Sequence, residues 1–184
     1  MKRWGVVGKR ILGLAIFVFS LAQTAYAGER TLQLRTTEDP DVIVEDAVCD
    51  EAGFTSNVRL GAAAWTYQAR ASDGEVLNDD IRQVGTAKAC VRITDFRFPP
   101  DSLHPFYVRF DLKEESYTAV GQCMVTSNNV PTPGLILAGC NLHLIQGPAG
   151  ILGGSLISSS VFNPFRLPGF GTGSYWTLRL HGVD

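Results

Sequence analysis

Apolar and polar residues alternate along most of this chain, and this period of two constrains the fold more than any other feature. Between residues 106 and 113 every second side chain is apolar: Phe106, Val108, Phe110 and Leu112. Successive side chains of a β-strand point to opposite faces of the sheet, so this pattern predicts a strand with one buried and one wet face. No convincing helical periodicity follows residue 27, which predicts an all-β protein.

Similar segments recur at the spacing of β-hairpins, with turn-forming residues between them. We expect strands over 57–71, 89–98, 106–113, 117–126, 135–145 and 173–182, a short one at 42–44, and one that contains Gly153 and Gly154. In the segment 89–98 the apolar residues change parity near Asp95, which predicts a β-bulge. Seven to nine strands predict a single antiparallel β-barrel, with a β-sandwich as the alternative.

The N-terminus has the features of a secretory signal peptide. Four basic residues precede the apolar segment 11–22, and Ala25-Tyr26-Ala27 supplies a small-x-small cleavage site. The apolar segment is too short to span a bilayer, which takes about 20 residues. We predict that residues 1–27 are removed and that 28–184 form one exported domain, periplasmic or secreted, without a membrane span. An uncleaved anchor is the alternative.

Cleavage would leave an acidic protein. Residues 1–27 carry four of the 16 Lys and Arg and no acid, so 12 basic residues would face 18 acidic ones, a net charge of −6 instead of −2. Binding to nucleic acid requires a basic patch, so a nucleic-acid partner is not expected. Seven acids fall within 38–51, where the calcium-loop spacing is missing, and a solvated acidic edge is the preferred interpretation.

The four cysteines predict two disulfides, because an even number in an exported chain is typical of an oxidising compartment. A turn centred between Val130 and Pro131 would pair residues whose numbers sum to roughly 261. Cys123 and Cys140 come within two of that sum, so they are expected nearly opposite each other on neighbouring strands. Cys49 and Cys90 then form the second bond.

Glycines crowd the stretch from Gly147 to Gly154, and their spacing does not fit a phosphate-binding loop. A Walker loop needs a lysine after its last glycine, and no lysine follows Lys113. The dinucleotide-binding pattern is also missing. Glycine inside an apolar strand usually marks a bulge, a bend or a close approach of another backbone. We therefore expect Gly153 and Gly154 to help the sheet curl and close.

The same stretch carries a resemblance to a known family. The pattern G-x-x-G-x-x-G-G, followed by a short strand, Phe162-Asn163-Pro164 and a final strand, resembles the last third of the dirigent and allene-oxide-cyclase-like barrels. Pro148-Ala149 stands where that family has Gly-Thr, and no arginine stands near Gly153. The resemblance implies an eight-stranded barrel with a small hydrophobic pocket, and no catalytic residue is carried over from it.

Catalytic and metal-binding patterns are missing from the sequence. The histidines do not stand in a zinc-binding arrangement: His104, His143 and His181. There is no G-x-S-x-G elbow, and the side chains of the neighbouring acids at 79–80 and at 114–115 diverge in an extended chain. We predict no catalytic residue, no metal and no cofactor, although a Ser–His–Asp set assembled in space is an alternative.

Aromatic side chains on predicted strands are the remaining candidates for a binding site. Trp65 and Tyr67 share one face of a strand, and Tyr107 stands with Arg109 on the wetter face of another. β-Domains hold sugars or flat organic ligands on aromatic rings beside Arg or Asn. Trp65, Tyr67, Tyr107 and Arg109 are therefore our candidate ligand-binding residues. A role in filling or sealing the core is the alternative.

Three hypotheses about function follow. The preferred one is an exported noncatalytic β-domain that binds a small hydrophobic or carbohydrate-like ligand or a protein partner. The second is a small barrel enzyme of isomerase or cyclase type acting on a hydrophobic substrate. The third is an oligomer-forming structural surface protein, because Ser116–Val183 carries only two charged residues and must bury much of its surface.

Overall fold

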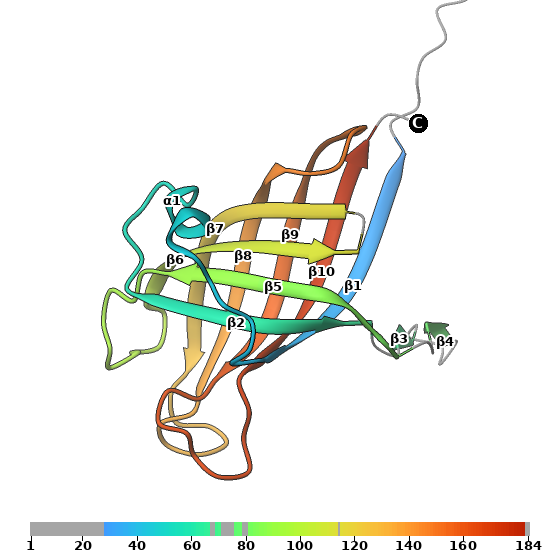
Figure 1. Ribbon diagram of the computed structural model, residues 1–184. Coiled ribbons are helices and arrows are strands. Elements are labelled where there is room, and N and C mark those ends of the chain that lie inside the picture. Colours follow the sequence, from blue (N-terminus) through green and yellow to red (C-terminus); the bar gives the residue numbers. More distant parts are fainter. Residues whose placement is uncertain (1–27, 67–68, 71–75, 79–80, 114, 183–184) are drawn as a thin grey trace, which may run out of the picture.

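The computed structural model describes residues 28–66, 69–70, 76–78, 81–113 and 115–182. Eight of its strands close into a single antiparallel barrel (Figure 1). The barrel strands follow one another around the ring in chain order, and the last strand pairs with the first. Such an up-and-down arrangement leaves no unpaired sheet edge. The predicted fold class is confirmed, in its barrel form.

The bounds of the elements are as follows. The barrel consists of β1 (Glu29–Glu38), β2 (Val58–Trp65), β5 (Gln83–Val91), β6 (Leu103–Leu112), β7 (Glu115–Ser127), β8 (Ile136–Gln146), β9 (Ile151–Phe162) and β10 (Gly173–Gly182). A small two-stranded sheet, β3 (Ala69–Arg70) and β4 (Val76–Asn78), lies in the connection from β2 to β5, and a short helix, α1 (Asp46–Asp50), lies in the connection from β1 to β2. The predicted signal peptide, residues 1–27, lies outside the described residues.

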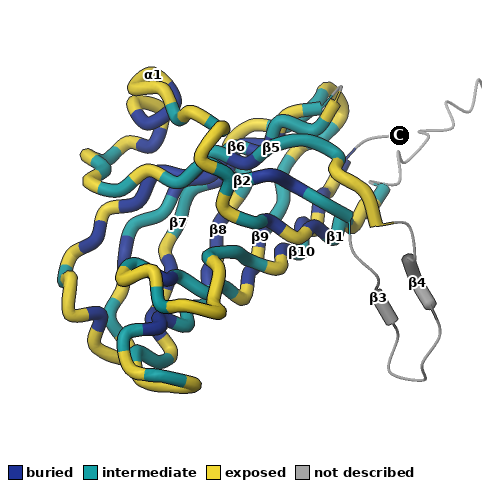
Figure 2. The backbone as a smooth tube through the Cα atoms, turned by 60° about the horizontal axis from the view of Figure 1, so that its bottom comes forward, coloured by how far each residue is buried: buried dark blue, intermediate teal, exposed yellow. Residues whose placement is uncertain are grey.

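The inward faces of the strands form one apolar core, as the alternation predicts. Buried and exposed segments alternate along the strands (Figure 2). On β10 the expected residues face inward and are almost fully buried: Trp176, Leu178 and Leu180. The indole N–H of Trp176 donates a hydrogen bond to Thr36 Oγ1 on β1 at 3.3 Å, so the one polar atom of this side chain is satisfied in the core.

Both predicted disulfides are present, and they hold different parts of the molecule. Cys123 on β7 is the direct register partner of Cys140 on β8, and their Cα atoms lie 3.9 Å apart inside the barrel. Cys49 lies in α1 and is bonded to Cys90 on the outer face of β5. Disulfides persist in oxidising compartments, so the pair indicates such an environment. Among the described residues no helix is long and apolar enough to cross a bilayer.

The connection from β1 to β2 folds back over the outside of the barrel. Its apolar residues pack on the outer faces of β5 and β6, against Cys90 and Tyr107: Val44, Val48, Cys49, Ala52 and Phe54. Its carboxylates Glu45 and Asp46 pair with Lys88 and Arg59 of the sheet beneath. The acidic edge predicted from the sequence is therefore a clip that covers part of the barrel wall.

Several segments differ from the expected secondary structure. β5 ends at Val91, so residues 92–98 form a loop, and the change of parity near Asp95 comes from the end of the strand instead of a bulge. Residues 42–44 belong to the clip and are not a strand, and β2 stops at Trp65. His104, which fits no zinc-binding pattern in the sequence, lies on β6 with its ring buried in the barrel.

The glycine-rich stretch does the structural work expected of it. A side chain at Gly154 would meet the backbone carbonyl of Arg179 on β10 at 2.5 Å, so the two strands can approach only because this residue has no Cβ. The ladder between β9 and β10 shifts register beside Gly153, at the passage from His181 to Gly182. A close approach and a bulge both lie where the glycines predicted them.

Candidate functional site

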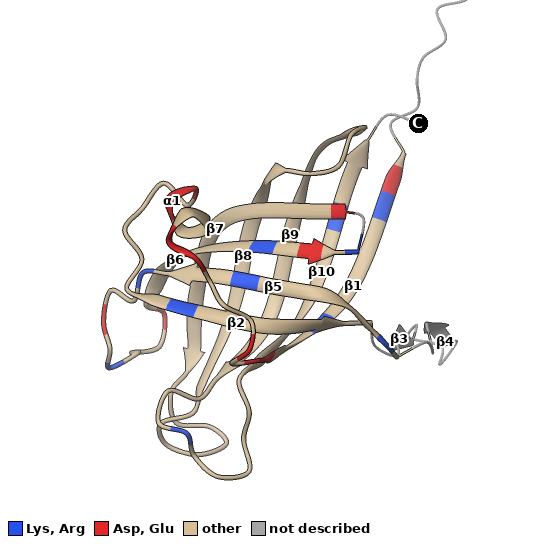
Figure 3. Cartoon of the chain, viewed as in Figure 1, with Lys and Arg blue, Asp and Glu red and all other residues tan. Residues whose placement is uncertain are grey.

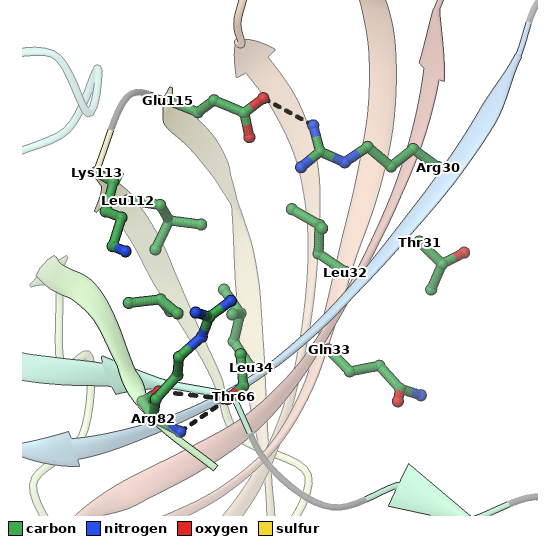
Figure 4. A pocket seen from close by; sticks show the side chains of 11 residues that line it. Arg30, Thr31, Leu32, Gln33, Leu34, Thr66, Arg82, Leu112, Lys113 and Glu115 are labelled. Atoms are coloured by element: carbon green, nitrogen blue, oxygen red, sulfur yellow. Dashed lines mark hydrogen bonds and ion pairs between the residues drawn. The ribbon is translucent and has the colours of Figure 1, made fainter. Parts of the chain in front are cut away.

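An open cavity of about 820 Å³ lies at the end of the barrel where β1 begins and β6 turns toward β7 (Figure 4). We call it the mouth cavity. Its floor is formed by apolar side chains from three strands: Leu32, Leu34, Val84 and Leu112. Alternation along β1 explains the lining, because Leu32 points into the opening while Thr31 and Gln33 point away from it (Figure 4). An apolar floor of this kind can remove the hydrophobic part of a ligand from water.

Charged side chains surround this floor, and two of them bridge the opening. Arg30 on β1 donates from Nη1 to Glu115 Oε1 on β7 at 2.8 Å. Three strands separate β1 from β7 on either side of the ring, so the ion pair spans the full width of the mouth. Arg82 and Lys113 also line the cavity, which gives three cationic side chains and one carboxylate among the lining residues.

The bridge is connected to the core below it. The hydroxyl of Tyr117, whose side chain is fully buried, donates to Glu115 Oε2 at 2.6 Å. Hydrogen bonds from Arg30 and Tyr117 lower the pKa of Glu115 below its ordinary value. Burial, together with the adjacent carboxylate, raises the pKa of Tyr117. The carboxylate is therefore held ionised and in a fixed position.

Of the residues predicted to bind a ligand, the three that the structure describes are not gathered in one site. Trp65 is half-buried at the end of β2, Arg109 lies on the outer face of β6, and Tyr67 lies outside the described residues. Trp65 pairs with Gln83 on β5 and Tyr107 with Cys90 on the same strand. Those partners are seven positions apart along β5, so roughly 23 Å separates Trp65 from Tyr107 along the strands.

Tyr107 was expected on a wet face, and this is wrong. The clip covers it completely, and its hydroxyl donates to Glu51 Oε2 at 2.7 Å. Burial contributes most to the raised pKa of Tyr107, and the hydrogen bond to Glu51 raises this pKa further. Arg109 stands on the same face, half-exposed, and donates from Nε to Asp111 Oδ1 at 2.8 Å. Tyr107 therefore holds the clip through Glu51, and Arg109 pairs with Asp111 on its own strand.

Polar groups that the sequence left unassigned lie inside the opposite end of the barrel. His104 Nδ1 accepts from the backbone N–H of Thr94 at 3.1 Å, and its Nε2 lies 3.1 Å from Ser102 Oγ. Burial lowers the pKa of His104, which favours its neutral form. Ser158 and Ser174 each lie within hydrogen-bond distance of Ser160, at 3.0 and 2.8 Å. His104 and the serines thus form two separate hydrogen-bonded groups at that end.

The interior between the two ends is nearly filled. Two small cavities lie within the barrel, of about 50 Å³ beside Trp176 and about 90 Å³ beside the Cys123–Cys140 disulfide. A drug-sized ligand needs a pocket of roughly 300 Å³ or more, so only the mouth cavity among these three offers that room. In the part of the chain that the structure describes, no three His, Cys, Asp or Glu side chains converge to hold a metal ion.

The mouth cavity could not be found from the sequence alone. Arg30 and Glu115 are 85 positions apart and meet only because the sheet closes on itself. The sequence indicated no site at residues 114–115, whereas Glu115 begins β7 and faces the opening. The alternation of side chains along β1, combined with a barrel topology, would have placed Arg30 and Leu32 on the inward face.

Comparisons with known proteins identify no relative of this chain. No model of a protein family, no curated protein and no solved structure matches the chain. The argument for function therefore depends on the geometry and chemistry of the site.

Proposed function

We propose that this chain is an exported noncatalytic β-domain that binds a small hydrophobic ligand in the mouth cavity. The observation that carries the proposal is an open space of about 820 Å³ with an apolar floor and a charged rim. A ligand's apolar body would cover Leu32 and Leu112, and its polar end would remain at the rim near Lys113. The two disulfides and the signal-like segment 1–27 support export to the periplasm or the exterior.

An uncharged fluorescent dye tests this function directly. N-phenyl-1-naphthylamine brightens when it enters an apolar site, so titration of the purified protein should give saturable binding. Leu32→Glu and Leu112→Glu place a charge on opposite sides of the floor and should each weaken binding about tenfold, because the dye would desolvate a carboxylate. Leu152→Ser is the matched control, since this exposed leucine belongs to the same end of the barrel but does not line the cavity.

The opposite result of the dye titration would refute the proposal. Unchanged dye affinity in both glutamate variants, with their melting temperatures preserved, would place the dye elsewhere and remove the basis of the proposal. N-terminal sequencing of protein recovered from an exporting host tests the localisation, and a chain that starts at Gly28 is the expected result.

A second candidate function, assembly into an oligomer, is favoured by the outer surface of β8, β9 and β10. The described part of these strands carries Arg179 as its one Lys, Arg, Asp or Glu, and large side chains stand exposed there: Ile145, Ile157 and Tyr175. A broad face without charge is typical of surfaces that pack against a copy. Native mass spectrometry of the purified protein reads subunit number and bound ligand in one measurement and so separates the two candidates.

A further inference from the structure

Three connections at the end of the barrel opposite the mouth cavity expose large apolar side chains. They are the β5–β6 connection (92–102), the β7–β8 connection (128–135) and the β9–β10 connection (163–172), and we call them the tip loops. Alternate connections of an up-and-down barrel lie at the same end, so these three are neighbours (Figures 1 and 2). Their exposed residues are Phe96 (63 % exposed), Val130 (61 %), Phe165 (64 %) and Phe170 (41 %).

The tip loops pack against one another and form one surface. The side-chain amide of Asn128 donates to the backbone carbonyl of Arg97 at 3.3 Å, which joins the first two loops. The ring of Phe165 lies against Gly134, which joins the second loop to the third. Single exposed apolar residues are ordinary, but a group of them on adjoining loops marks an interaction surface.

Each tip is held outward by a local side-chain hydrogen bond. Asp95 Oδ1 accepts from the backbone N–H of Arg97 at 2.9 Å, so the loop turns at Phe96. Ser127 Oγ accepts from the N–H of Val130 at 3.0 Å. These bonds fix the tips before any partner arrives, so little conformational entropy is lost on binding.

The third loop is organised by one buried side chain. Asn163 Oδ1 accepts from the N–H of Leu167 at 2.8 Å, and Asn163 Nδ2 donates to the carbonyls of Leu167 and Phe170 at 3.0 and 2.9 Å. All three bonds close the loop around Asn163 and leave the rings of Phe165 and Phe170 in solvent. The exposed aromatic rings therefore result from a satisfied hydrogen-bond network.

Exposed arginines stand in two of the tip loops, and acidic residues lie near both of them. Arg97 in the first tip loop and Arg166 in the third are both exposed, and Figure 3 shows the basic and acidic segments of the chain. Asp95 pairs with Arg97, and the backbone N–H of Asp101 donates to Val125 on β7. Glu38 is the last residue of β1, where its N–H donates to the carbonyl of Thr172.

The clip, which holds most of the remaining acids of this side, turns away from the tips. Its contacts with Lys88, Arg59 and the Cys90 disulfide fix it along the outer wall of the barrel. Exposed apolar rings and the exposed guanidinium group of Arg166 therefore lie at the same end of the barrel. Guanidinium groups bind phosphate oxygens, and apolar tips enter the interface of a bilayer just below the headgroups.

We infer that the tip loops dock this protein on the surface of a lipid bilayer that contains anionic phospholipids, with Phe96, Phe165 and Phe170 in the interface and Arg166 on the phosphates. The bilayer is preferred over a protein partner because the exposed aromatic rings stand on several loops at one end of the barrel, with the exposed Arg166 between Phe165 and Phe170 in sequence, a combination that fits a soft, anionic surface. The inference rests on the tip loops alone and does not depend on ligand binding in the mouth cavity.

Vesicle flotation of the purified protein, with both disulfides formed, tests this assignment. Vesicles of phosphatidylglycerol and phosphatidylcholine in equal parts should carry the protein upward, and vesicles of phosphatidylcholine alone should carry less. The triple variant Phe96→Ser, Phe165→Ser, Phe170→Ser should lower the partition coefficient by about tenfold or more, because binding scales with the apolar area inserted. Leu152→Ser, 74 % exposed at the opposite end, is the matched control and should bind as the unaltered protein does.

A spectroscopic variant shows which side chains enter the lipid. Phe165→Trp should shift its emission to shorter wavelength when anionic vesicles are added, and Leu152→Trp should not. Failure of the protein to float with either vesicle would overturn the inference. So would equal flotation of the triple variant, given an unchanged melting temperature. A loss of self-association in the triple variant without any flotation would assign the surface to a protein contact and likewise overturn it.

Discussion

The ion pair across the mouth cavity makes a prediction whose size can be worked out from the structure. Arg30 and Glu115 have side-chain exposures of 48 % and 34 %, so the pair is partly solvated. Pairs of this kind contribute about 0.2–1 kcal/mol to the free energy of unfolding. We expect Arg30→Gln to cost about 0.5 kcal/mol, and a double-mutant cycle with Glu115→Gln to give a coupling free energy of the same size.

The hydroxyl of Tyr117 should contribute more than the arginine. It is a fully buried donor to an ionised acceptor, and such hydrogen bonds contribute about 1.5–3 kcal/mol. Tyr117→Phe also leaves Glu115 free to bind water at the open mouth, which reduces the loss. We therefore expect Tyr117→Phe to lower the free energy of unfolding by about 1–1.5 kcal/mol, two to three times the effect of Arg30→Gln.

The same group predicts how stability changes in acid. The pKa of Glu115 is lowered in the folded state by the hydrogen bonds from Arg30 and Tyr117, whereas the unfolded chain has the ordinary value near 4.5. The unfolded state therefore binds a proton at higher pH than the native state does. The stabilisation is fully present above the unfolded pKa and is lost as the pH falls through the lower native pKa.

Urea unfolding of the unaltered protein, the three single variants and the double variant of Arg30 and Glu115, at neutral pH and at about pH 3, measures these effects. The unaltered protein should lose more stability on acidification than Glu115→Gln does, since the variant has no carboxylate to protonate. A coupling of zero at neutral pH, together with the same acid dependence in Glu115→Gln, would refute the idea that this bridge holds the mouth together.

Three further predictions concern the barrel itself. Replacement of Cys123 and Cys140 by Ala opens a loop with a sequence separation of 17 and should cost about 3 kcal/mol in urea unfolding; an unchanged midpoint would contradict the loop-closure argument. Gly154→Ala places a Cβ against a backbone carbonyl of the next strand and should cost about 1–3 kcal/mol, whereas Gly153→Ala, with open space around it, should melt close to the unaltered protein. The lowered pKa of His104 means that its contribution is present above about pH 6.5 and is lost as the pH falls, so His104→Gln should flatten thermal stability between about pH 7 and pH 5, and an unchanged slope would count against a buried neutral ring.

Local periodicity and turn position were enough to predict the disulfide inside the barrel. The loop 128–135 sets which residues of β7 and β8 face each other, and the observed pairs sum to 263 through Cys123 and Cys140. A period of two then decides which of those residues face inward. This inference needs only neighbouring strands, so it does not depend on how the rest of the sheet closes.

Tyr107 shows where such reasoning ends. Its strand has the alternation of a sheet with one wet face, and that is what the bare barrel would have. The cover over Tyr107 comes from residues 44–54, whose acidic composition looked like a solvated edge. Only the tertiary structure shows that Glu45 and Asp46 pair with a lysine and an arginine of the wall while apolar residues on either side of them pack with Tyr107. A pattern of period two cannot reveal a cover supplied by a distant segment.

The alternation of connections in this barrel also separates its two proposed surfaces. The mouth cavity and the tip loops lie at opposite ends of strands such as β6, whose 10 residues span roughly 33 Å along the strand. Effects of substitutions more than about 10 Å apart, without shared partners, usually add. A protein that combines Leu112→Glu with the triple phenylalanine variant should therefore lose dye affinity as Leu112→Glu does and vesicle affinity as the triple variant does. If Leu112→Glu alone, or the triple variant alone, lost both dye affinity and vesicle affinity, the substitutions would be acting through the stability of the barrel instead of through separate surfaces.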